Sequence, residues 1–484
     1  HSVDGSVTPV SPDPLILRGG EVIACQQVGF NRFQRLFCTT LCPSLRYRGQ
    51  GVFMSQLAFQ FRQLVQRMWF LPAAFSLIAV LSIVIAWFLA RFAPPDLPFT
   101  MPSNGVMSIL TILASSLLTV AVFALSTMVA ALSSASSSTS PRAVSLITGD
   151  RSAQTSISMF IGAFLFSIVG IIGLSAGFYS EAGRLFLFAV TLGVVVLVVT
   201  ALIRWIGQIS AIGRVGHTID RVERATRDAF AMNADHPFFD CRVQIIAPQG
   251  MPIRARTVGY VQHVDASKLQ RLAEEHKLTI AITARPGAYV APDRPLMLVE
   301  GVVPDDCVDD LAGAFVVGDS RTFYSDPRFG LVVLGEIASK ALSPGINDPG
   351  TAIDVIGTLV RVLVDRVPDD QDQEARYDLV TVPPLDPADL IDDAFRPIAR
   401  DGAATIEVVM RLLAGLKTLA YSSELLRAPA LAMARDATAR ARQALTAESD
   451  LETLAAAAAF AQAEAEAEAS RPTRRRAKKA PPKG

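Results

Sequence analysis

The pattern of apolar and polar positions sets one part of the chain apart. Four long apolar stretches lie at residues 70–90, 106–132, 157–178 and 185–203, and no Asp, Glu, Lys, Arg or His interrupts any of them. A helix needs roughly 20 residues to cross a hydrocarbon core of about 30 Å, and its backbone groups must be paired within the segment. The pattern therefore predicts an α-helical integral membrane protein with four transmembrane helices in residues 54–209.

Charge changes this picture locally, because the formal net charge of the 484 residues is zero. Arginine gathers before the first stretch, between the second and third, and after the fourth: Arg62, Arg67, Arg142, Arg151, Arg204, Arg214, Arg221, Arg224 and Arg227. The positive-inside rule then predicts a bacterial inner-membrane protein with both termini in the cytoplasm. Trp69, Trp87 and Trp205 lie near the ends of the stretches, where aromatic rings favour the membrane interface.

The two ends of the chain differ from the rest. Residues 1–53 are rich in Pro and Gly and have no signal-peptide pattern, so we expect a disordered or mis-called N-terminal extension. Residues 446–484 begin with an Ala/Glu-rich segment, expected to form a marginal solvent-exposed helix, and end in a disordered basic tail. Cys241 and Cys307 are expected to be cytosolic, and we predict no disulfide.

Residues 210–445 predict a cytoplasmic α+β domain. Strand patterns occur at 242–247, 253–258, 259–265, 278–284 and 296–299, and helical patterns at 211–232 and 267–276. The strand, helix, strand, turn and strand order of residues 259–301 resembles half of the barrel-sandwich fold of biotinyl and lipoyl domains, which implies a small β-barrel or sandwich-like part. Lipoyl domains present a lysine on the hairpin tip, and the turn RPGAYV has none, so we expect no cofactor.

A helix break follows this region. Residues 329–342 and 351–364 have helical patterns, and the segment SPGINDPG separates them. Pro344 cannot continue a helix, Gly345 can take the left-handed conformation of a C-terminal cap, and Asp348 can cap the second helix. The residues of interest are Ser343, Pro344, Gly345, Asn347, Asp348 and Pro349. They predict a capped corner, which the capping rules favour, or a place where Asn347 and Asp348 orient a ligand.

Two segments support a family resemblance. They are DPRFGLVVLGEIASKALSPGINDPGTA, residues 326–352, and SPRAVSLITGDRSAQ, residues 140–154. Together with the membrane stretches they resemble an uncharacterised family of bacterial predicted membrane proteins, a domain of unknown function with the motif ALSPGINDP. The resemblance covers residues 53–427. It implies a membrane location and supplies no catalytic residue.

Hydroxyl groups follow one face of the second apolar stretch. They belong to Ser108, Thr111, Ser115, Thr119, Ser126, Ser133 and Ser137. At 100° per residue these positions fall within about an 80° sector. Such a face can line a water-filled path if several subunits bring their second spans together. The commoner use of small polar residues is helix contact, with hydrogen bonds across the interface or back to the helix's own carbonyls.

Other chemistry is scarce. No acidic residue or histidine lies inside a span, which disfavours proton-coupled transport, and the small residues of the third span, such as Gly170 and Gly173, predict close helix packing. No nucleotide loop, nucleophile elbow or zinc-ligand spacing appears, so we predict no enzyme and no metal. The run DDCVDD, residues 305–310, is more typical of a solvated helix face than of a cation loop.

The leading hypothesis is therefore an oligomeric, channel-like permeation protein with a regulatory cytoplasmic domain. The alternative is a non-transporting membrane scaffold or sensor whose domain binds a partner or small ligand. The expected partners are the lipid bilayer and further copies of the chain, with the basic tail touching anionic lipid. Nucleic acid is not expected, because the other domains offer no basic patch.

Overall fold

The computed structural model describes residues 103–138, 140–148, 151–179, 181–209, 214–235, 237–366 and 375–470, with eight scattered positions between 73 and 88. The described elements belong to one unit, Phe53–Gly484. Our expectations for residues 1–53 and for the basic tail lie outside the described residues. Of the first expected span, the eight described positions are all helical.

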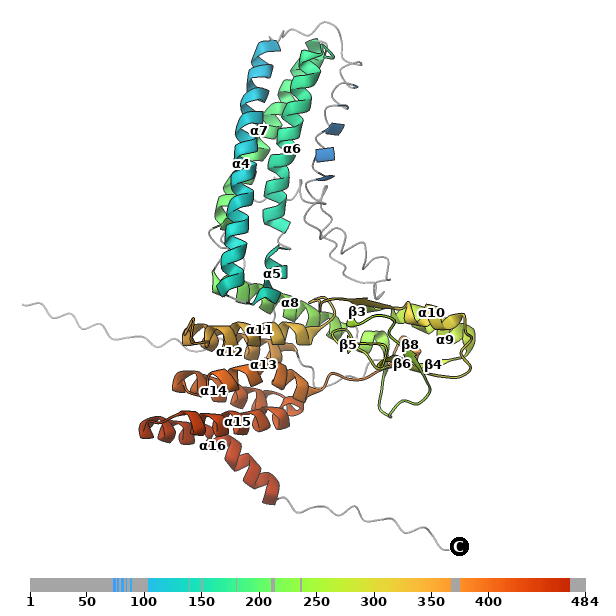
Figure 1. The fold of residues 1–484 in the computed structure, drawn as a ribbon, viewed down its shortest axis with the longest axis vertical. Helices are drawn as coiled ribbons and strands as arrows, with labels where there is room; N and C mark the ends of the chain where they lie inside the picture. Colours follow the sequence, from blue (N-terminus) through green and yellow to red (C-terminus); the bar gives the residue numbers. More distant parts are fainter. Residues whose placement is uncertain are drawn as a thin grey trace, which may run out of the picture. The chain divides into compact units, whose positions relative to one another are not determined.

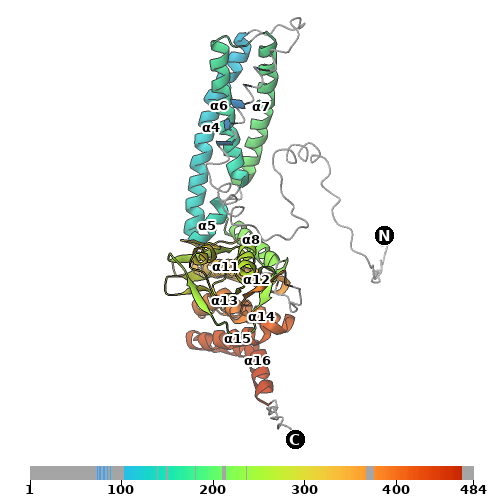
Figure 2. The same ribbon diagram turned by 90° about the vertical axis from the view of Figure 1, so that its right-hand side faces the viewer.

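Among the described residues, three helices are long and apolar enough to cross a membrane. They are α4 (Ser103–Ser138), α6 (Arg151–Ser175) and α7 (Glu181–Ile209), and they correspond to the second, third and fourth predicted stretches. They run side by side in Figures 1 and 2. Helix α4 has 36 residues, and at about 1.5 Å per residue it exceeds the ~30 Å thickness of a hydrocarbon core.

Helix α6 is the most enclosed of the three, with half of its span buried. A Cβ atom added at Gly170 would lie 3.1 Å from Leu110 Cδ1 of α4, so glycine permits a close approach of the two helices. The buried Ser167 donates to the carbonyl oxygen of Ala163 at 2.9 Å. Trp205 of α7 is also buried, in a cluster with Ala121 and Ala124 of α4. Its ring packs edge-to-face on Phe123 of α4 at 5.9 Å between ring centroids.

Two helices connect α4, α6 and α7 with the C-terminal half. Helix α5 (Pro141–Thr148) follows α4 in sequence and precedes α6, and helix α8 (Val215–Asp235) follows α7. Helix α5 contacts α4 and α8, as Figure 1 also shows. Helix α8 contacts α11 and α12, so it belongs to the helical core of the C-terminal half.

Two sheets share one core in the α/β part. The larger has the strand order β1-β8-β4-β6-β2 and the smaller has the order β5-β3-β7. The elements are η1 (Pro237–Asp240), β1 (Cys241–Val243), β2 (Met251–Arg254), β3 (Gly259–Val264), α9 (Ala266–His276), β4 (Thr279–Ile282), β5 (Tyr289–Val290), β6 (Pro295–Glu300), α10 (Cys307–Ala312), β7 (Phe315–Gly318) and β8 (Tyr377–Val382). Both β1 and β4 pair in parallel with β8, and β6 pairs antiparallel with β4 and β2.

The order of elements in residues 259–301 is the one expected, but their assembly differs from a local half-barrel. Strands β3 and β5 lie in the smaller sheet, whereas β4 and β6 lie in the larger one. Strand β8, about 95 residues after β4, inserts between β4 and β1. Side chains such as Val261, Ile280 and Met297 fill one core between the sheets and α9.

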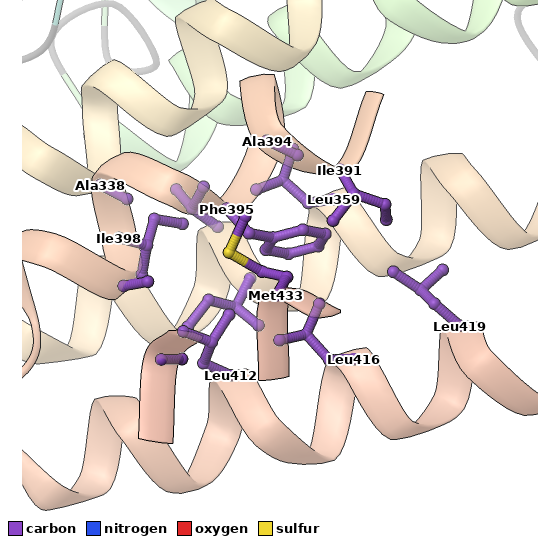
Figure 3. Packing of buried hydrophobic residues seen from close by; sticks show 14 of the residues in the cluster. Ala338, Leu359, Ile391, Ala394, Phe395, Ile398, Leu412, Leu416, Leu419 and Met433 are labelled. Carbon is purple, nitrogen blue, oxygen red and sulfur yellow. The ribbon is translucent and has the colours of Figure 1, made fainter. Parts of the chain in front are cut away.

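The helical part comprises α11 (Pro327–Ala341), α12 (Pro349–Arg366), α13 (Pro387–Asp401), α14 (Ile406–Ser422), α15 (Glu424–Ala444) and α16 (Glu448–Ser470). Figure 3 shows Phe395 and Met433 at the centre of its core, beside Leu412 and Leu416. The alanine-rich segment is not the isolated solvent helix we expected. Leu454, Ala458 and Ala461 of α16 are buried in the same core, because alanine's small side chain allows close packing on α14 and α15.

Candidate functional site

The hydroxyl face of α4 lies opposite to the face that packs on α6 and α7. Ser108, Thr111, Ser115, Thr119, Ser126 and Ser133 are exposed, and the side chain of Ser137 lies outside the described residues. The buried face consists of Val106, Leu110, Ala114, Leu117, Ala121, Ala124 and Met128. At 100° per residue, the centres of these faces lie about 150° apart. Within the described part of the chain, the hydroxyl face therefore lies outside the packing of α4.

The hydroxyls are hydrogen-bonded within their own helix. Ser108, Thr111, Ser115 and Thr119 each donate to a carbonyl oxygen three or four residues earlier, at 2.8, 2.8, 3.1 and 3.3 Å. A hydroxyl that donates in this way still has lone pairs that accept from water or from another chain. Val122 and Val129 are exposed on the same side, so the continuous polar part of the face is its N-terminal half.

The predicted corner is an exposed loop between α11 and α12. Pro344, Gly345, Asn347 and Asp348 are exposed, and Ser343 and Pro349 are partly buried. The left-handed residue is Asn347, with φ at 50°, and not Gly345 as expected. The reason is that the amides of Ile346 and Asn347 both donate to the carbonyl oxygen of Ser343, so the turn continues past Gly345. Asparagine tolerates the left-handed region better than most residues.

Asp348 caps α12. Its carboxylate accepts from the amide of Thr351 at 3.1 Å and from the Thr351 hydroxyl at 2.6 Å, and Pro349 is the first residue of the helix. These hydrogen bonds, first that of the hydroxyl and then that of the amide, lower the pKa of Asp348. The Asp348 amide donates to the Ala341 carbonyl oxygen at 2.8 Å and so ties the corner to α11. This carboxylate serves the fold, and Asn347 is the exposed polar side chain beside it.

The two segments of the family resemblance meet in the structure. The buried Ser140 donates from Oγ to Glu336 Oε2 at 2.7 Å, and Arg142 forms an ion pair with the other carboxylate oxygen of Glu336. Ala143 of α5 is fully buried in the core of the helical part. The sequence patterns do not single out Glu336. Its signal in the sequence was a lone carboxylate within the apolar helix LVVLGEIAS.

A buried ionic cluster joins the α/β part to the helical part. Asp326, 2% exposed, caps α11 through the amide of Phe329 and receives Arg321 at 2.7 Å and 3.0 Å. Burial raises the pKa of Asp326, and Arg321 opposes that shift. Gly287 of the turn RPGAYV has φ at 92°, and a Cβ atom added there would lie 2.2 Å from Asp326 Oδ2. The turn that resembled a lipoyl hairpin tip is therefore packed onto this carboxylate.

Arg285, from the same turn, is partly buried beside it. It donates to the carbonyl oxygen of Pro383 and to Asn233 Oδ1, and its guanidinium lies over the ring of Phe239, 5.2 Å from the centroid. Burial lowers the pKa of Arg285 to about 10, and the charge of Asp326 opposes that shift, so Arg285 stays charged at neutral pH. This cluster holds the two parts together by hydrogen bonds to α8 and to the end of β8.

One hollow lies beside the cluster in the described part of the chain. The hollow lined by Ala229, Met232, Asn233, Phe239 and Ser325 has no room for a water-sized molecule. Among the described residues, no group of three or more His, Cys, Asp or Glu side chains is placed to hold a metal ion. In the acidic run, Asp309 pairs with Arg256 and Asp310 pairs with Lys268 at 3.2 Å, as on a solvated helix face.

Comparison with known proteins places the chain among membrane proteins. The model of a family described as "Predicted membrane protein (DUF2254)" matches residues 65–418. The relatives include "Uncharacterized protein Mb1321c" of Mycobacterium bovis and "Uncharacterized protein Rv1290c" of Mycobacterium tuberculosis, each 34% identical over 118 residues, or 23% of this chain and 23% of the relative. The chain thus matches about a quarter of the length of these relatives. No solved structure matches the chain. Because the family model covers most of the sequence, this protein belongs to the DUF2254 family of predicted membrane proteins.

Proposed function

We propose that the protein is a multi-pass inner-membrane protein that assembles as a homo-oligomer and forms a channel-like path for ions or small solutes. The supporting observation is the exposed hydroxyl face of α4, which lies opposite to its packing face. Three described helices do not enclose a pore by themselves, so the path requires several copies of α4. Hydroxyl lone pairs from neighbouring copies would then accept hydrogen bonds from water or coordinate a permeating ion.

The lack of charge in the spans favours passive permeation. No ionisable side chain occurs in residues 106–132, 157–178 and 185–203. Proton relays and ion-coupled transporters use intramembrane carboxylates or histidines. A neutral hydroxyl face instead suits a path through which a solute moves down its gradient.

The proposal includes orientation and partners. The arginine-rich segments beside the spans favour a cytoplasmic location for both termini and for the C-terminal half. The basic tail, which lies outside the described residues, would touch anionic lipid through Arg474, Arg475, Arg476, Lys478 and Lys479, at about 1 kcal/mol per charge near the surface. The proposal includes neither a nucleic-acid partner nor an enzymatic reaction.

Replacing Ser115 and Thr119 by Leu in the full chain tests the path. In proteoliposomes loaded with a series of monovalent ions, we expect flux through the wild-type protein and at least a tenfold loss in the double variant, because two branched side chains would fill the path. The matched control is Thr200→Leu on α7. Thr200 is also exposed and donates to its own helix at 2.8 Å, so its replacement should leave flux unchanged.

Absence of flux from a well-folded, oligomeric wild-type protein would overturn the proposal. The same absence would favour the alternative, a scaffold or sensor in which the spans anchor a domain that binds a partner or ligand. Exposed Asn347 at the corner between α11 and α12 is then the place to test for binding.

A further inference from the structure

Helix α5 is built as a bridge between the membrane helices and the C-terminal half. It has eight residues, and in sequence it lies between the end of α4 at Ser138 and the start of α6 at Arg151. Ala143 is fully buried in the helical core that also contains Val222 and Phe329, and Leu146 packs against the same core. The segment between α4 and α6 is therefore part of the core of the C-terminal half.

Glu336 holds the N-terminal end of α5. Its carboxylate accepts from Ser140 Oγ at 2.7 Å and pairs with Arg142, while the Ser140 hydroxyl itself accepts from the Arg142 amide at 3.2 Å. Hydrogen bonds to an ionised carboxylate are roughly twice as strong as neutral ones, and a helix N-terminus favours a negative charge nearby. The Glu336 side chain is 29% exposed and Ser140 is 3% exposed, so solvent only partly screens their hydrogen bond. The Arg142 side chain is 57% exposed, so solvent screens its ion pair with Glu336 more strongly.

The far end of α5 is held by α8. Arg221 donates to the carbonyl oxygen of Leu146 at 3.3 Å. Helix α8 in turn lies very close to α11, since a Cβ atom added at Gly330 would lie 1.9 Å from Thr226 Oγ1. Helices α8 and α11 thus pack closely together, and α5 is attached to one of them at each end.

We propose that the contact of Glu336 with Ser140 and Arg142 is a latch through which the C-terminal half controls the membrane helices. Closed, the latch holds α5 in the helical core and fixes the ends of α4 and α6 next to it. Opening it releases α5 and lets the end of α4 that carries Ser133 move. This inference rests on the proposed permeation function for its consequence, but the latch itself can be measured without it.

Hydrogen exchange on the full chain in lipid nanodiscs tests the latch. Glu336→Gln keeps the shape of the side chain and removes its charge, and Arg142→Glu faces Glu336 with a second carboxylate. Both variants should speed exchange of the α5 amides, residues 142–148, by about tenfold or more. The double variant Arg142→Glu with Glu336→Arg restores opposite charges and should return exchange to within a few-fold of wild type.

Asp392→Asn is the matched control, because Asp392 forms an exposed ion pair with Arg396 on α13 in the same half of the chain. It should leave exchange in α5 unchanged. Unchanged exchange in Glu336→Gln and Arg142→Glu would overturn the latch. Equal loss of protection in α5 and in α14 would do the same, since it would indicate general unfolding of the C-terminal half.

Flux in proteoliposomes tests the consequence. If the wild-type protein conducts, Glu336→Gln should change the flux at least threefold while the control leaves it unchanged, and an unchanged flux with a released α5 would overturn the regulatory role. If the wild-type protein does not conduct, the proposed function fails. The exchange data then still decide whether Glu336 holds α5.

Discussion

Gly287→Ala is predicted to be strongly destabilising, because a side chain at this position would meet both backbone strain and a steric overlap. Its φ of 92° lies where an L side chain is strained. A Cβ atom there would also lie 2.2 Å from one Asp326 carboxylate oxygen and 2.8 Å from the other. Asp326 is 2% exposed and held by Arg321, so it cannot simply turn into solvent.

The magnitude follows from these two terms. Left-handed strain costs about 1–2 kcal/mol for a residue with a Cβ atom. Moving the carboxylate weakens charged hydrogen bonds that are each worth about 1.5–3 kcal/mol. We therefore expect the free energy of unfolding to fall by about 3–5 kcal/mol.

Urea unfolding of the detergent-solubilised full chain, followed by pulse proteolysis, measures this change. Gly345→Ala is the control, since Gly345 lies in open space outside the left-handed region, and it should change the free energy by less than about 0.5 kcal/mol. A loss below about 1 kcal/mol in Gly287→Ala would refute the argument that this turn rests on a fixed carboxylate.

Two further changes test other contacts of the C-terminal half. Gly330→Ala places a Cβ atom 1.9 Å from Thr226 Oγ1 and should lower the free energy of unfolding by about 1–3 kcal/mol. Thr226→Ala should recover part of this loss, and a double-mutant cycle without coupling between the two positions would contradict the close approach. Asp348→Ala removes the cap of α12 and should cost about 1 kcal/mol near neutral pH. Because the folded state lowers the pKa of Asp348, this stabilisation is present above the ordinary pKa of about 3.9 and is lost as the pH falls through the lower folded value. Unfolding of wild type and Asp348→Ala between about pH 2.5 and 6 should therefore converge in acid, and a constant difference would contradict the assignment.

Local patterns predicted the elements of this fold well where one rule dominated. The apolar stretches after residue 105 form α4, α6 and α7, because backbone groups in a bilayer must be hydrogen-bonded within their own segment. Asp348 followed by Pro349 placed the start of α12 correctly, since capping depends on neighbours in sequence. The left-handed residue was misplaced at Gly345, because how far the turn continues depends on hydrogen bonds to Ser343 that composition does not reveal.

Long-range pairing was the part that the sequence did not reveal. Strand β8, from a distant part of the chain, lies between β1 and β4. The half-barrel pattern of residues 259–301 therefore lacked one strand of the larger sheet. Glu336 and Ser140 are separated by 196 positions, and only folding brings them together. The interior positions of Arg285 and Asp326 were likewise not predicted, because the sequence pattern does not distinguish a charged residue in the interior from one in solvent.

The hydroxyl face of α4 combines a feature that the sequence predicts with one that only the structure shows. Its one-sidedness follows from spacing alone, and the structure adds that it lies opposite to the packing face and donates to its own helix. The assembly of several chains in the membrane decides which molecules cover this face.

The reactivity of a cysteine placed at Ser115 tests the proposed path most directly. In a background without native cysteines, Ser115→Cys is compared with Val196→Cys, an exposed position on α7, and with Leu117→Cys, which is buried against other helices. The reagent is a small, charged thiol reagent applied to the oligomer in liposomes, because the thiolate that reacts forms only where water reaches. The proposal predicts labelling at Ser115 at least tenfold faster than at Val196 or Leu117. Equally slow labelling at all three positions would show that the hydroxyl face of α4 is dry and would contradict a water-filled path.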